Sequence, residues 1–161
     1  MFEAYHKTPV GFVRIRADEH AITSVSIRDE EHEESVSASP LIDAAILQLD
    51  EYFAGKRQSF NLPLNQSGST FQKEVWDNLM SVQFGTTMSY LQLSNQMGNP
   101  LAIRAIATAN GKNNLWIIVP CHRIIGSDGS LTGYAGGLWR KRWLLDHEAS
   151  VLGIGQTKLF V

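Results

Sequence analysis

Two runs near the start of the chain alternate between apolar and polar residues. GFVRIRAD (residues 11–18) and AITSVSIRD (residues 21–29) have the two-residue period of strands that bury one face. Residues 1–28 therefore predict an antiparallel meander. The acidic and serine-rich stretch EEHEESVSASP (residues 30–40) comes next and is predicted to form a loop.

A helical period replaces the alternation after this loop. Pro40 suits the first turn of a helix, and Gly55 is placed to end it. The apolar residues between them recur at intervals of three, four and seven positions: Ile42, Ala45, Ile46, Leu49 and Phe53. The meander and this helix together predict an α/β domain over residues 1–68.

The pattern changes at Ser69 to consecutive short helices. Ser69 and Ser89 each stand three residues before a glutamine, which is the capping-box spacing of a helix start. The second of these helices is expected to stop at Gly98. Asn99 and Pro100 follow at once, and we interpret them as the N-cap and first turn of a further helix, PLAIRAIATAN.

A helix, a glycine turn and a second helix form the sequence pattern of a helix-turn-helix. An ordinary helical hairpin in a small bundle fits the same pattern. Arg104 favours the helix-turn-helix, because it stands among apolar and alanine residues, whereas a solvent-facing helix would usually carry several charges.

The rest of the chain predicts a strand, a turn, a loop and a last helix. The apolar run LWIIV (residues 115–119) is strand-like and leads into PCHR. Five glycines between Gly126 and Gly137 indicate a loop that turns tightly or that another group approaches closely, with a flexible surface loop as the alternative. LWRKRWLLDHE then predicts the last helix. Residues 69–161 thus predict a second, mainly helical domain.

Charge is divided unevenly between the two predicted domains. The 161 residues have a formal net charge of -2 at pH 7, which argues against a general binder of polyanions. Residues 1–68 hold 6 Lys/Arg and 11 Asp/Glu, whereas residues 69–161 hold 8 and 5. Residues 100–142 contain six Lys/Arg and a single acidic residue, Asp128. These six cations predict a local basic patch that binds nucleic acid, with a solvated surface as the alternative. They are Arg104, Lys112, Arg123, Arg140, Lys141 and Arg142.

The chain has one cysteine, Cys121. It cannot form an internal disulfide, and zinc sites usually need several Cys or His ligands, so we expect neither a metal nor a cofactor. The N-terminus lacks the features of a signal peptide, and no stretch approaches the roughly 20 apolar residues that cross a membrane. We therefore expect a cytoplasmic protein without a membrane partner.

The neighbours of Cys121 favour a nucleophile over a small buried side chain. Pro120 restricts Val119 to extended geometry and ends the strand, so we place Cys121 on a turn. His122 follows, and a histidine can generate the reactive thiolate if the backbone bends or a water bridges the two side chains. Glu148 completes a Cys-His-acid arrangement, which fits a cysteine hydrolase as well as an alkyl acceptor.

The stretch RAIATANGKNNLWIIVPCHRIIGSDGSLTGYAGGLWRKRWLLDHE closely resembles the signature region of the O6-alkylguanine-DNA alkyltransferases. The resemblance covers Tyr90 to Glu148 in detail. It implies an N-terminal RNase H-like domain, with an antiparallel sheet and a helix, and a mainly helical C-terminal domain with a winged-helix-like helix-turn-helix. It also implies DNA repair, by irreversible and stoichiometric transfer of the alkyl group of O6-alkylguanine in double-stranded DNA to Cys121.

The same resemblance implies roles for single residues. Cys121 would be the alkyl acceptor, and His122 with Glu148 would remove its proton through a water. Tyr90 would contact the flipped nucleotide and protonate the departing guanine, and Asn113 would hold the active-site turn.

Further residues are implied at the DNA and at the base. Arg104 would enter the base stack when the lesion is extruded, with Ala105 beside it on the DNA-binding helix. The implied pocket residues are Trp116, Ile124, Tyr134 and Ala135. Two positions depart from the family pattern, since Asn114 stands where many relatives have proline, and Trp116 where smaller residues are common.

Two other functions compete with alkyl transfer. A non-enzymatic lesion-binding module would flip the base without reacting, but relatives of that kind carry another residue in place of Cys121. A cysteine hydrolase would be indifferent to Arg104. We expect a monomer in solution, while cooperative binding along DNA and activity on O4-alkylthymine stay open.

Overall fold

The computed structural model describes residues 1–34 and 39–153. The chain divides into two compact units: unit 1 comprises Met1–Ser67 and Asn114–Ile118, and unit 2 comprises Gly68–Asn113 and Val119–Val161. The chain therefore enters unit 1 twice, and its second visit ends directly before the segment that carries Cys121.

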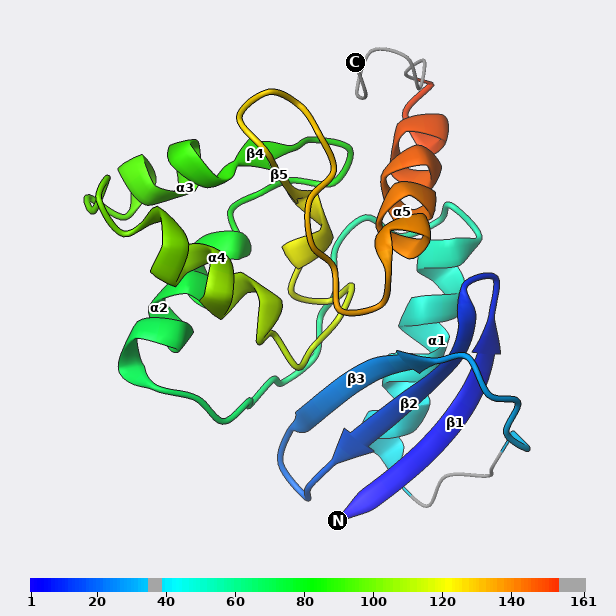
Figure 1. The fold of residues 1–161 in the computed structure, drawn as a ribbon. Helices are drawn as coiled ribbons and strands as arrows, with labels where there is room; N and C mark the ends of the chain where they lie inside the picture. The colour runs from blue at the N-terminus through cyan, green and yellow to red at the C-terminus, as the bar shows by residue number, and fades with distance from the viewer. Residues whose placement is uncertain (35–38, 154–161) are drawn as a thin grey trace. The chain divides into compact units, whose positions relative to one another are not determined.

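Unit 1 is built on a three-stranded antiparallel sheet. Its order is β1 (Phe2–Thr8), β2 (Gly11–Ala17) and β3 (Ile22–Arg28). The buried residues of the sheet lie on one face, among them Ala4 of β1, Val13 and Ile15 of β2, and Val25 and Ile27 of β3, and α1 (Pro40–Phe53) packs on that face (Figure 1). Ser39 caps this helix, because its side chain accepts a hydrogen bond from the backbone of Ile42. The predicted meander and helix are confirmed.

Residues 114–118, the second segment of unit 1, are hydrogen-bonded to β3. The backbone N–H of Val25 donates to the carbonyl of Asn114 at 2.8 Å, and that of Trp116 donates to the carbonyl of Val25 at 3.0 Å. Leu115 lies between them and forms a parallel bridge with Val25. This short ladder attaches the segment 114–118 to the sheet.

The prediction of a strand over LWIIV is wrong. Only Leu115 pairs with a strand, and the backbone then turns, with Ile118 N–H donating to the carbonyl of Trp116 at 2.8 Å. Ile117 lies in the left-handed region at φ 72°, which is strained for a β-branched residue. The run is apolar because Leu115, Ile117 and Ile118 are buried, so burial of a turn explains the pattern that suggested a strand.

Unit 2 contains three packed helices, α2 (Thr70–Leu79), α3 (Tyr90–Gln96) and α4 (Ile103–Gly111). Both predicted capping boxes are present, with Ser69 and Ser89 as N-caps. The indole N–H of Trp76 on α2 donates to the carbonyl of Ala109 at 2.9 Å, which fixes the end of α4. The sequence α3, turn, α4 is the predicted helix-turn-helix.

The predicted start of α4 is wrong. Asn99 does not cap the helix, since α4 begins at Ile103 and its N-cap is Ala102, without a side-chain hydrogen bond. The backbone N–H of Ala102 instead donates to the carbonyl of Asn99 at 3.1 Å. Asn99 and Pro100 thus occupy the first two positions of a β-turn, for which the same two residue types are favoured.

The remaining elements of unit 2 are a short two-stranded sheet, the turn that carries Cys121 and the last helix. β4 (Met88–Ser89) pairs in parallel with β5 (Ile124–Ile125), and a single turn of 3-10 helix, η1 (Cys121–Arg123), precedes β5. The last helix is α5 (Leu138–Val151), as predicted. Among the described residues, no helix is long and apolar enough to cross a membrane.

Candidate active site

The turn η1 places the only cysteine in the interior. Cys121 is 6% exposed, and its backbone N–H donates to the carbonyl of Val119 at 2.8 Å. The backbone N–H of Arg123 donates to the carbonyl of Pro120 at 3.1 Å, which closes the turn. The bend that a Cys-His pair requires is therefore present.

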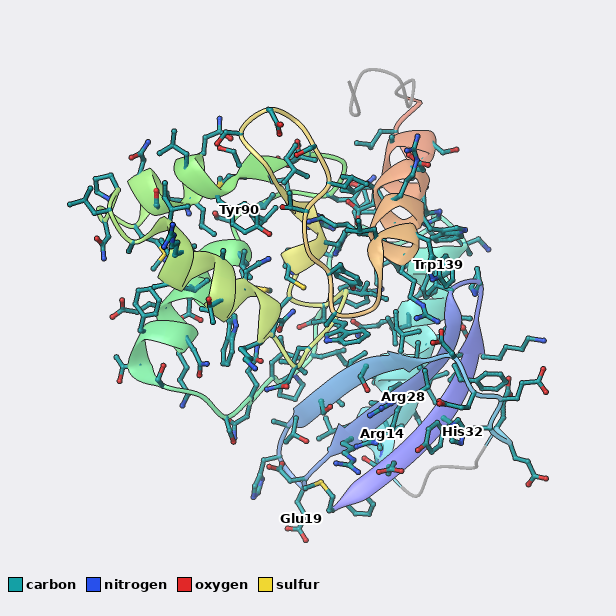
Figure 2. All side chains as sticks on the ribbon, in the orientation of Figure 1. Arg14, Glu19, Arg28, His32, Tyr90 and Trp139 are labelled. Carbon is teal, nitrogen blue, oxygen red and sulfur yellow. The ribbon has the colours of Figure 1, made fainter. Side chains whose placement is uncertain are left out.

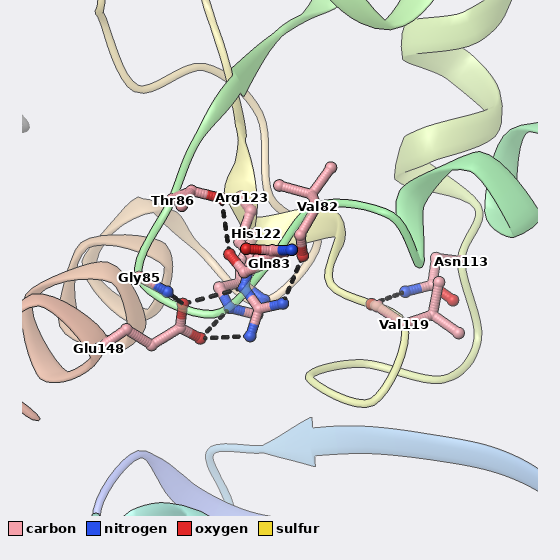
Figure 3. Close-up of polar contacts among 9 residues, drawn as sticks. All are labelled: Val82, Gln83, Gly85, Thr86, Asn113, Val119, His122, Arg123 and Glu148. Atoms are coloured by element: carbon pink, nitrogen blue, oxygen red, sulfur yellow. Dashed lines mark hydrogen bonds and ion pairs between the residues drawn. The ribbon is translucent and has the colours of Figure 1, made fainter. Parts of the chain in front are cut away.

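Three donors converge on the carboxylate of Glu148, which lies on α5 and is fully buried (Figure 3). His122 Nε2 lies 2.7 Å from Oε2. Arg123 binds both oxygens, with Nε 2.9 Å from Oε1 and Nη2 3.0 Å from Oε2. The backbone N–H of Gly85 donates to Oε1 at 3.1 Å. The predicted partnership of His122 and Glu148 is thus seen in the geometry, together with an arginine that the sequence reading had assigned to a surface patch.

Charge in this cluster is arranged so that the carboxylate is ionised and the imidazole is neutral. Burial alone would raise the pKa of Glu148, but the attraction of His122 and Arg123 outweighs it and holds the pKa below the ordinary 4.5. Burial lowers the pKa of His122 below 6.5, and Glu148 opposes this only in part. A carboxylate only accepts hydrogen bonds, so Nε2 of the neutral imidazole carries the hydrogen.

The second ring nitrogen of His122 is then an acceptor. His122 Nδ1 is buried and has no hydrogen-bond partner among the described residues. A buried acceptor without a partner is costly, so a water or a substrate proton is expected to satisfy it. His122 is therefore prepared to take a proton, and Glu148 stabilises the imidazolium that results.

The thiol of Cys121 is subject to opposing effects. Burial raises its pKa above the ordinary value. A side-chain hydrogen bond from Asn113 and the positive charge of Lys141 act in the opposite direction and favour the thiolate. Asn113 also donates from Nδ2 to the carbonyl of Val119 at 2.9 Å, so it binds the turn as the resemblance implied. At rest the thiol is protonated, and its reaction requires a base.

Lys141 is a site residue that the sequence reading missed. Its side chain on α5 is fully buried, and Nζ donates to the carbonyls of Thr132 at 2.6 Å and Gly133 at 3.3 Å. Burial lowers its pKa to about 8, against a smaller upward effect of Cys121. Lys141 thus holds the glycine loop to α5 and supplies charge near the thiol. Nothing in the sequence distinguishes it from the solvated lysine that the pattern suggested.

Asn110 was also missed. This buried residue on α4 lies 3.5 Å from the carbonyl of Cys121 through Nδ2, while its Oδ1 has no partner among the described residues. The helix that carries Arg104 is therefore bonded at its other end to the turn that carries Cys121.

The predicted pocket residues fall in two places. Ile124 is buried, Ala135 is exposed, and Tyr134 is half-buried with its hydroxyl in the interior. Burial, and a smaller effect of the Cys121 charge, raise the pKa of Tyr134 well above 10, so it stays a neutral phenol. These three belong to unit 2, whereas Trp116 belongs to unit 1, and its place in the pocket stays a prediction.

The residues predicted to meet DNA lie on the helix-turn-helix. Arg104 and Ala105 are exposed near the start of α4, and Tyr90 is the half-buried first residue of α3. Leu101, in the turn between the helices, is 96% exposed.

The predicted basic patch is largely wrong. Arg123, Arg140 and Lys141 are buried at 6%, 5% and 0% exposure, because each satisfies acceptors inside unit 2. The exposed cations of the six are Arg104, Lys112 and Arg142. Within residues 1–34 and 39–153, no group of three His, Cys, Asp or Glu side chains is placed to hold a metal ion.

Two family models match the chain over most of its length. The model described as 6-O-methylguanine DNA methyltransferase, ribonuclease-like domain, matches residues 1–66. The model described as 6-O-methylguanine DNA methyltransferase, DNA binding domain, matches residues 70–150. The chain belongs to this family.

Individual family members are similar along nearly the whole chain. A methylated-DNA--protein-cysteine methyltransferase of Methanosarcina acetivorans is 39% identical over 155 residues, which cover 93% of this chain and 99% of the relative. The constitutive one of Bacillus subtilis is 40% identical over 142 residues, covering 81% and 84%. The crystal structure of Mycobacterium tuberculosis OGT in complex with DNA matches with a TM-score of 0.84 and 37% identity, covering 92% of this chain and 93% of that one. The predicted fold class is confirmed.

Glu148→Gln tests whether the carboxylate holds the cluster together. The substitution leaves the charge of Arg123 buried without a counter-charge, so we expect the free energy of unfolding at pH 7 to fall by about 3–5 kcal/mol. Because the pKa of Glu148 is lowered, its contribution is complete above pH 4.5 and is lost only as the pH falls below that ordinary value. Urea denaturation followed by circular dichroism measures the change.

Asp146→Asn on the same helix is the matched control. Asp146 lies 3.8 Å from the exposed Arg142, and such a pair contributes less than about 1 kcal/mol. Losses of similar size in the two variants would show that Glu148 has no special role in stability.

Lys141→Met tests the influence of the buried lysine on the thiol. Removing the charge raises the pKa of Cys121 further, so we expect iodoacetamide to alkylate Cys121 about three- to tenfold more slowly at pH 7. Above pH 8 the difference should shrink, because Lys141 of the unmodified protein loses its own proton there. Rates are followed by intact mass, with Arg142→Met as the exposed control. Equal rates for Lys141→Met and the unmodified protein at pH 7 would exclude the electrostatic effect.

Proposed function

We propose that this chain repairs alkylated DNA as a methylated-DNA--protein-cysteine methyltransferase, by moving the alkyl group of O6-alkylguanine to Cys121. The observation that carries the proposal is a buried thiol directly followed in the turn by a neutral His122, whose Nδ1 is an unused acceptor and whose Nε2 is bound to an ionised Glu148. Family membership and the DNA-bound relative support the choice of substrate.

The first step removes the thiol proton. His122 Nδ1 accepts it through a bridging water, and Glu148 stabilises the imidazolium. Asn113 and Lys141 stabilise the thiolate as it forms, because the side chain of the first donates to sulfur and the second is positively charged. The raised pKa of the resting thiol is thus overcome as His122 takes up its proton.

The second step transfers the alkyl group. A bond forms between Sγ and the alkyl carbon while the bond from that carbon to guanine O6 breaks, and the electron pair leaves with the base. Sulfur suits this displacement because it is a soft nucleophile, and a proton from Tyr90 neutralises the departing guanine. The proton taken by His122 restores the tyrosine through solvent, so charge and atoms balance.

The product limits the protein to one reaction. The alkylated cysteine is a thioether, which has no easy hydrolysis, unlike the thioester of a hydrolase intermediate. None of the roles proposed above for the residues around Cys121 includes cleavage of the carbon–sulfur bond. The transfer is therefore stoichiometric, and each molecule acts once.

Reaching the lesion requires extrusion of the nucleotide. Unpairing and unstacking a base costs a few kcal/mol, and a side chain that fills the gap offsets this cost. Arg104 is proposed for that role, with Ala105 beside it and Tyr90 against the flipped nucleotide. The exposed start of α4, with small or apolar neighbours, is consistent with entry between bases. Ile124, Tyr134, Ala135 and Trp116 are proposed to line the base pocket.

The remaining assignments belong to the same proposal. They are an N-terminal domain of residues 1–68 and a DNA-binding and acceptor domain of residues 69–161, a cytoplasmic location, and action as a monomer without a cofactor. A lesion-binding module is the alternative, because base flipping and binding do not by themselves require transfer.

The deciding experiment is intact-protein mass after mixing with a duplex that contains one O6-methylguanine. We expect a gain of one methyl group per molecule, assigned to Cys121 by peptide mapping and absent in Cys121→Ser. Selective binding of the damaged duplex without any gain in mass would replace alkyl transfer by lesion sensing. Repeated turnover would exclude the suicidal mechanism.

Arg104→Ala separates base flipping from chemistry. Free O6-benzylguanine needs no extrusion, so its reaction with the variant should be within about twofold of normal, whereas repair in duplex DNA should slow by about tenfold or more, since the cost of a few kcal/mol is no longer offset. Single-turnover rates with the two substrates give the comparison. Equal losses with both would contradict the flipping role of Arg104.

A further inference from the structure

The sheet of unit 1 has a second face, which carries charge rather than a core. The strand period places one set of side chains against α1 and the other on the opposite side, here called the outer face. Figure 2 shows Arg14 and Arg28 on this side of the sheet, turned to the viewer, with α1 behind. The outer-face residues are Glu3, Tyr5, Lys7, Phe12, Arg14, Arg16, Ser24, Ser26 and Arg28.

Positive charge dominates the outer face. Four of its side chains are cationic, and the only carboxylate is Glu3, which binds Arg16 at 2.7 Å and lies 3.7 Å from Arg14. The hydrogen bond from Arg16 lowers the pKa of Glu3, so this carboxylate is ionised and already in use. Arg28 and Lys7 form no ion pair with any described residue. The face is therefore basic, although unit 1 is rich in acidic residues.

Unused donors lie at the centre of this face. Arg14 on β2 is directly opposite Ser26 on β3. Arg14 Nε and Ser26 Oγ are both shielded from water, and neither has a hydrogen-bond partner within residues 1–34 and 39–153. Arg14 Nε has only the long 3.7 Å ion pair with Glu3, so the hydrogen-bonding capacity of the Arg14 guanidinium is not exhausted within the described residues.

Aromatic rings border the cations. The ring of Tyr5 is stacked on that of His32, with centroids 3.9 Å apart, and Phe12 meets the same imidazole edge-on at 6.4 Å. Arginines, hydroxyls and aromatic rings on an open antiparallel sheet are the combination with which sheet proteins bind nucleic-acid backbones and unstacked bases.

We propose that the outer face binds phosphate groups of a nucleic-acid backbone, as a contact separate from the alkyl-acceptor site of unit 2. Arg14 and Arg28 donate to phosphate oxygens, which arginine forks match in shape and charge. The contact carries no sequence information, since it involves the backbone alone.

A carboxylate partner is less favourable than phosphate on the same observations. The acidic residues Asp29, Glu30, Glu31, Glu33 and Glu34 follow directly after Arg28, so their local concentration near the face is high. None of them forms an ion pair with Arg14, Arg16 or Arg28 in the part of the chain that the structure describes. Carboxylates from a second copy would be more dilute than these, and we do not expect them to occupy the face.

The test is the salt dependence of binding to undamaged DNA. A fluorescent short duplex and the matching single strand are titrated with the unmodified protein and with Arg14→Gln/Arg28→Gln at a series of salt concentrations. Each phosphate contact contributes about 0.9 to the slope of log affinity against log salt for a duplex, and about 0.7 for a single strand. We expect the double variant to lose about 1.8 of the duplex slope, so that between about 50 and 200 mM salt its affinity falls about twelvefold less than normal.

Lys56→Gln/Arg57→Gln is the matched control. It also removes two positive charges from unit 1, at positions after α1 that are not on the outer face. The slope of this control should equal that of the unmodified protein within experimental error. Transfer to free O6-benzylguanine is measured for both variants and should be unchanged, which separates this proposal from the proposed function.

Two results would overturn the proposal. One is equal slopes for the outer-face variant, the control and the unmodified protein. The other is sedimentation equilibrium that shows a salt-sensitive dimer of the unmodified protein that the outer-face variant cannot form, because the face would then bind a second copy of the chain.

Discussion

The buried carboxylate of Glu148 is the constraint on which unit 2 depends. A bare charge in the interior is unfavourable by several kcal/mol, so the fold must bring donors to it from every side. Those donors come from separate segments: the turn at Gly85, the imidazole of His122 and the guanidinium of Arg123. The contacts of the Glu148 carboxylate with His122 and Arg123 join α5 to η1, and they also fix which nitrogen of His122 carries the hydrogen. The stability of unit 2 and the capacity of His122 to accept a proton therefore depend on the same carboxylate.

Burial of the cysteine keeps the thiol unreactive until a base removes its proton. A solvent-exposed thiolate would react with any oxidant or electrophile, whereas a desolvated thiol stays protonated and inert. Asn113 and Lys141 do not reverse this resting state, but they lower the cost of leaving it once a base accepts the proton. A protein that can react only once benefits from such protection, because every unintended reaction would remove a whole molecule.

Local signals predicted most of the fold. Capping boxes at Ser69 and Ser89 and the apolar period of α1 depend on neighbouring residues only, and they were read correctly. The prediction of Asn99 as a helix N-cap was wrong because an asparagine before a proline suits a β-turn as well as a helix cap. The proposed acceptor Cys121 and its proposed partners His122 and Glu148 were predicted from their chemistry and the family resemblance. The location of the charged side chains was the least predictable property. The net charge of a segment does not reveal that Arg123 and Lys141 are buried.

The double passage of the chain through unit 1 has a consequence for its integrity. Residues 114–118 are hydrogen-bonded to β3, yet both of their neighbours in sequence belong to unit 2. A cut at the junction of Ser67 and Gly68 would therefore not release two independent pieces. The shorter fragment would still hold a stretch of the longer one as part of its sheet. The longer fragment alone would expose Leu115, Ile117 and Ile118, the last of which lies three residues before Cys121. The protein is in this respect indivisible, and a version without its N-terminal sheet would have to find another cover for that stretch.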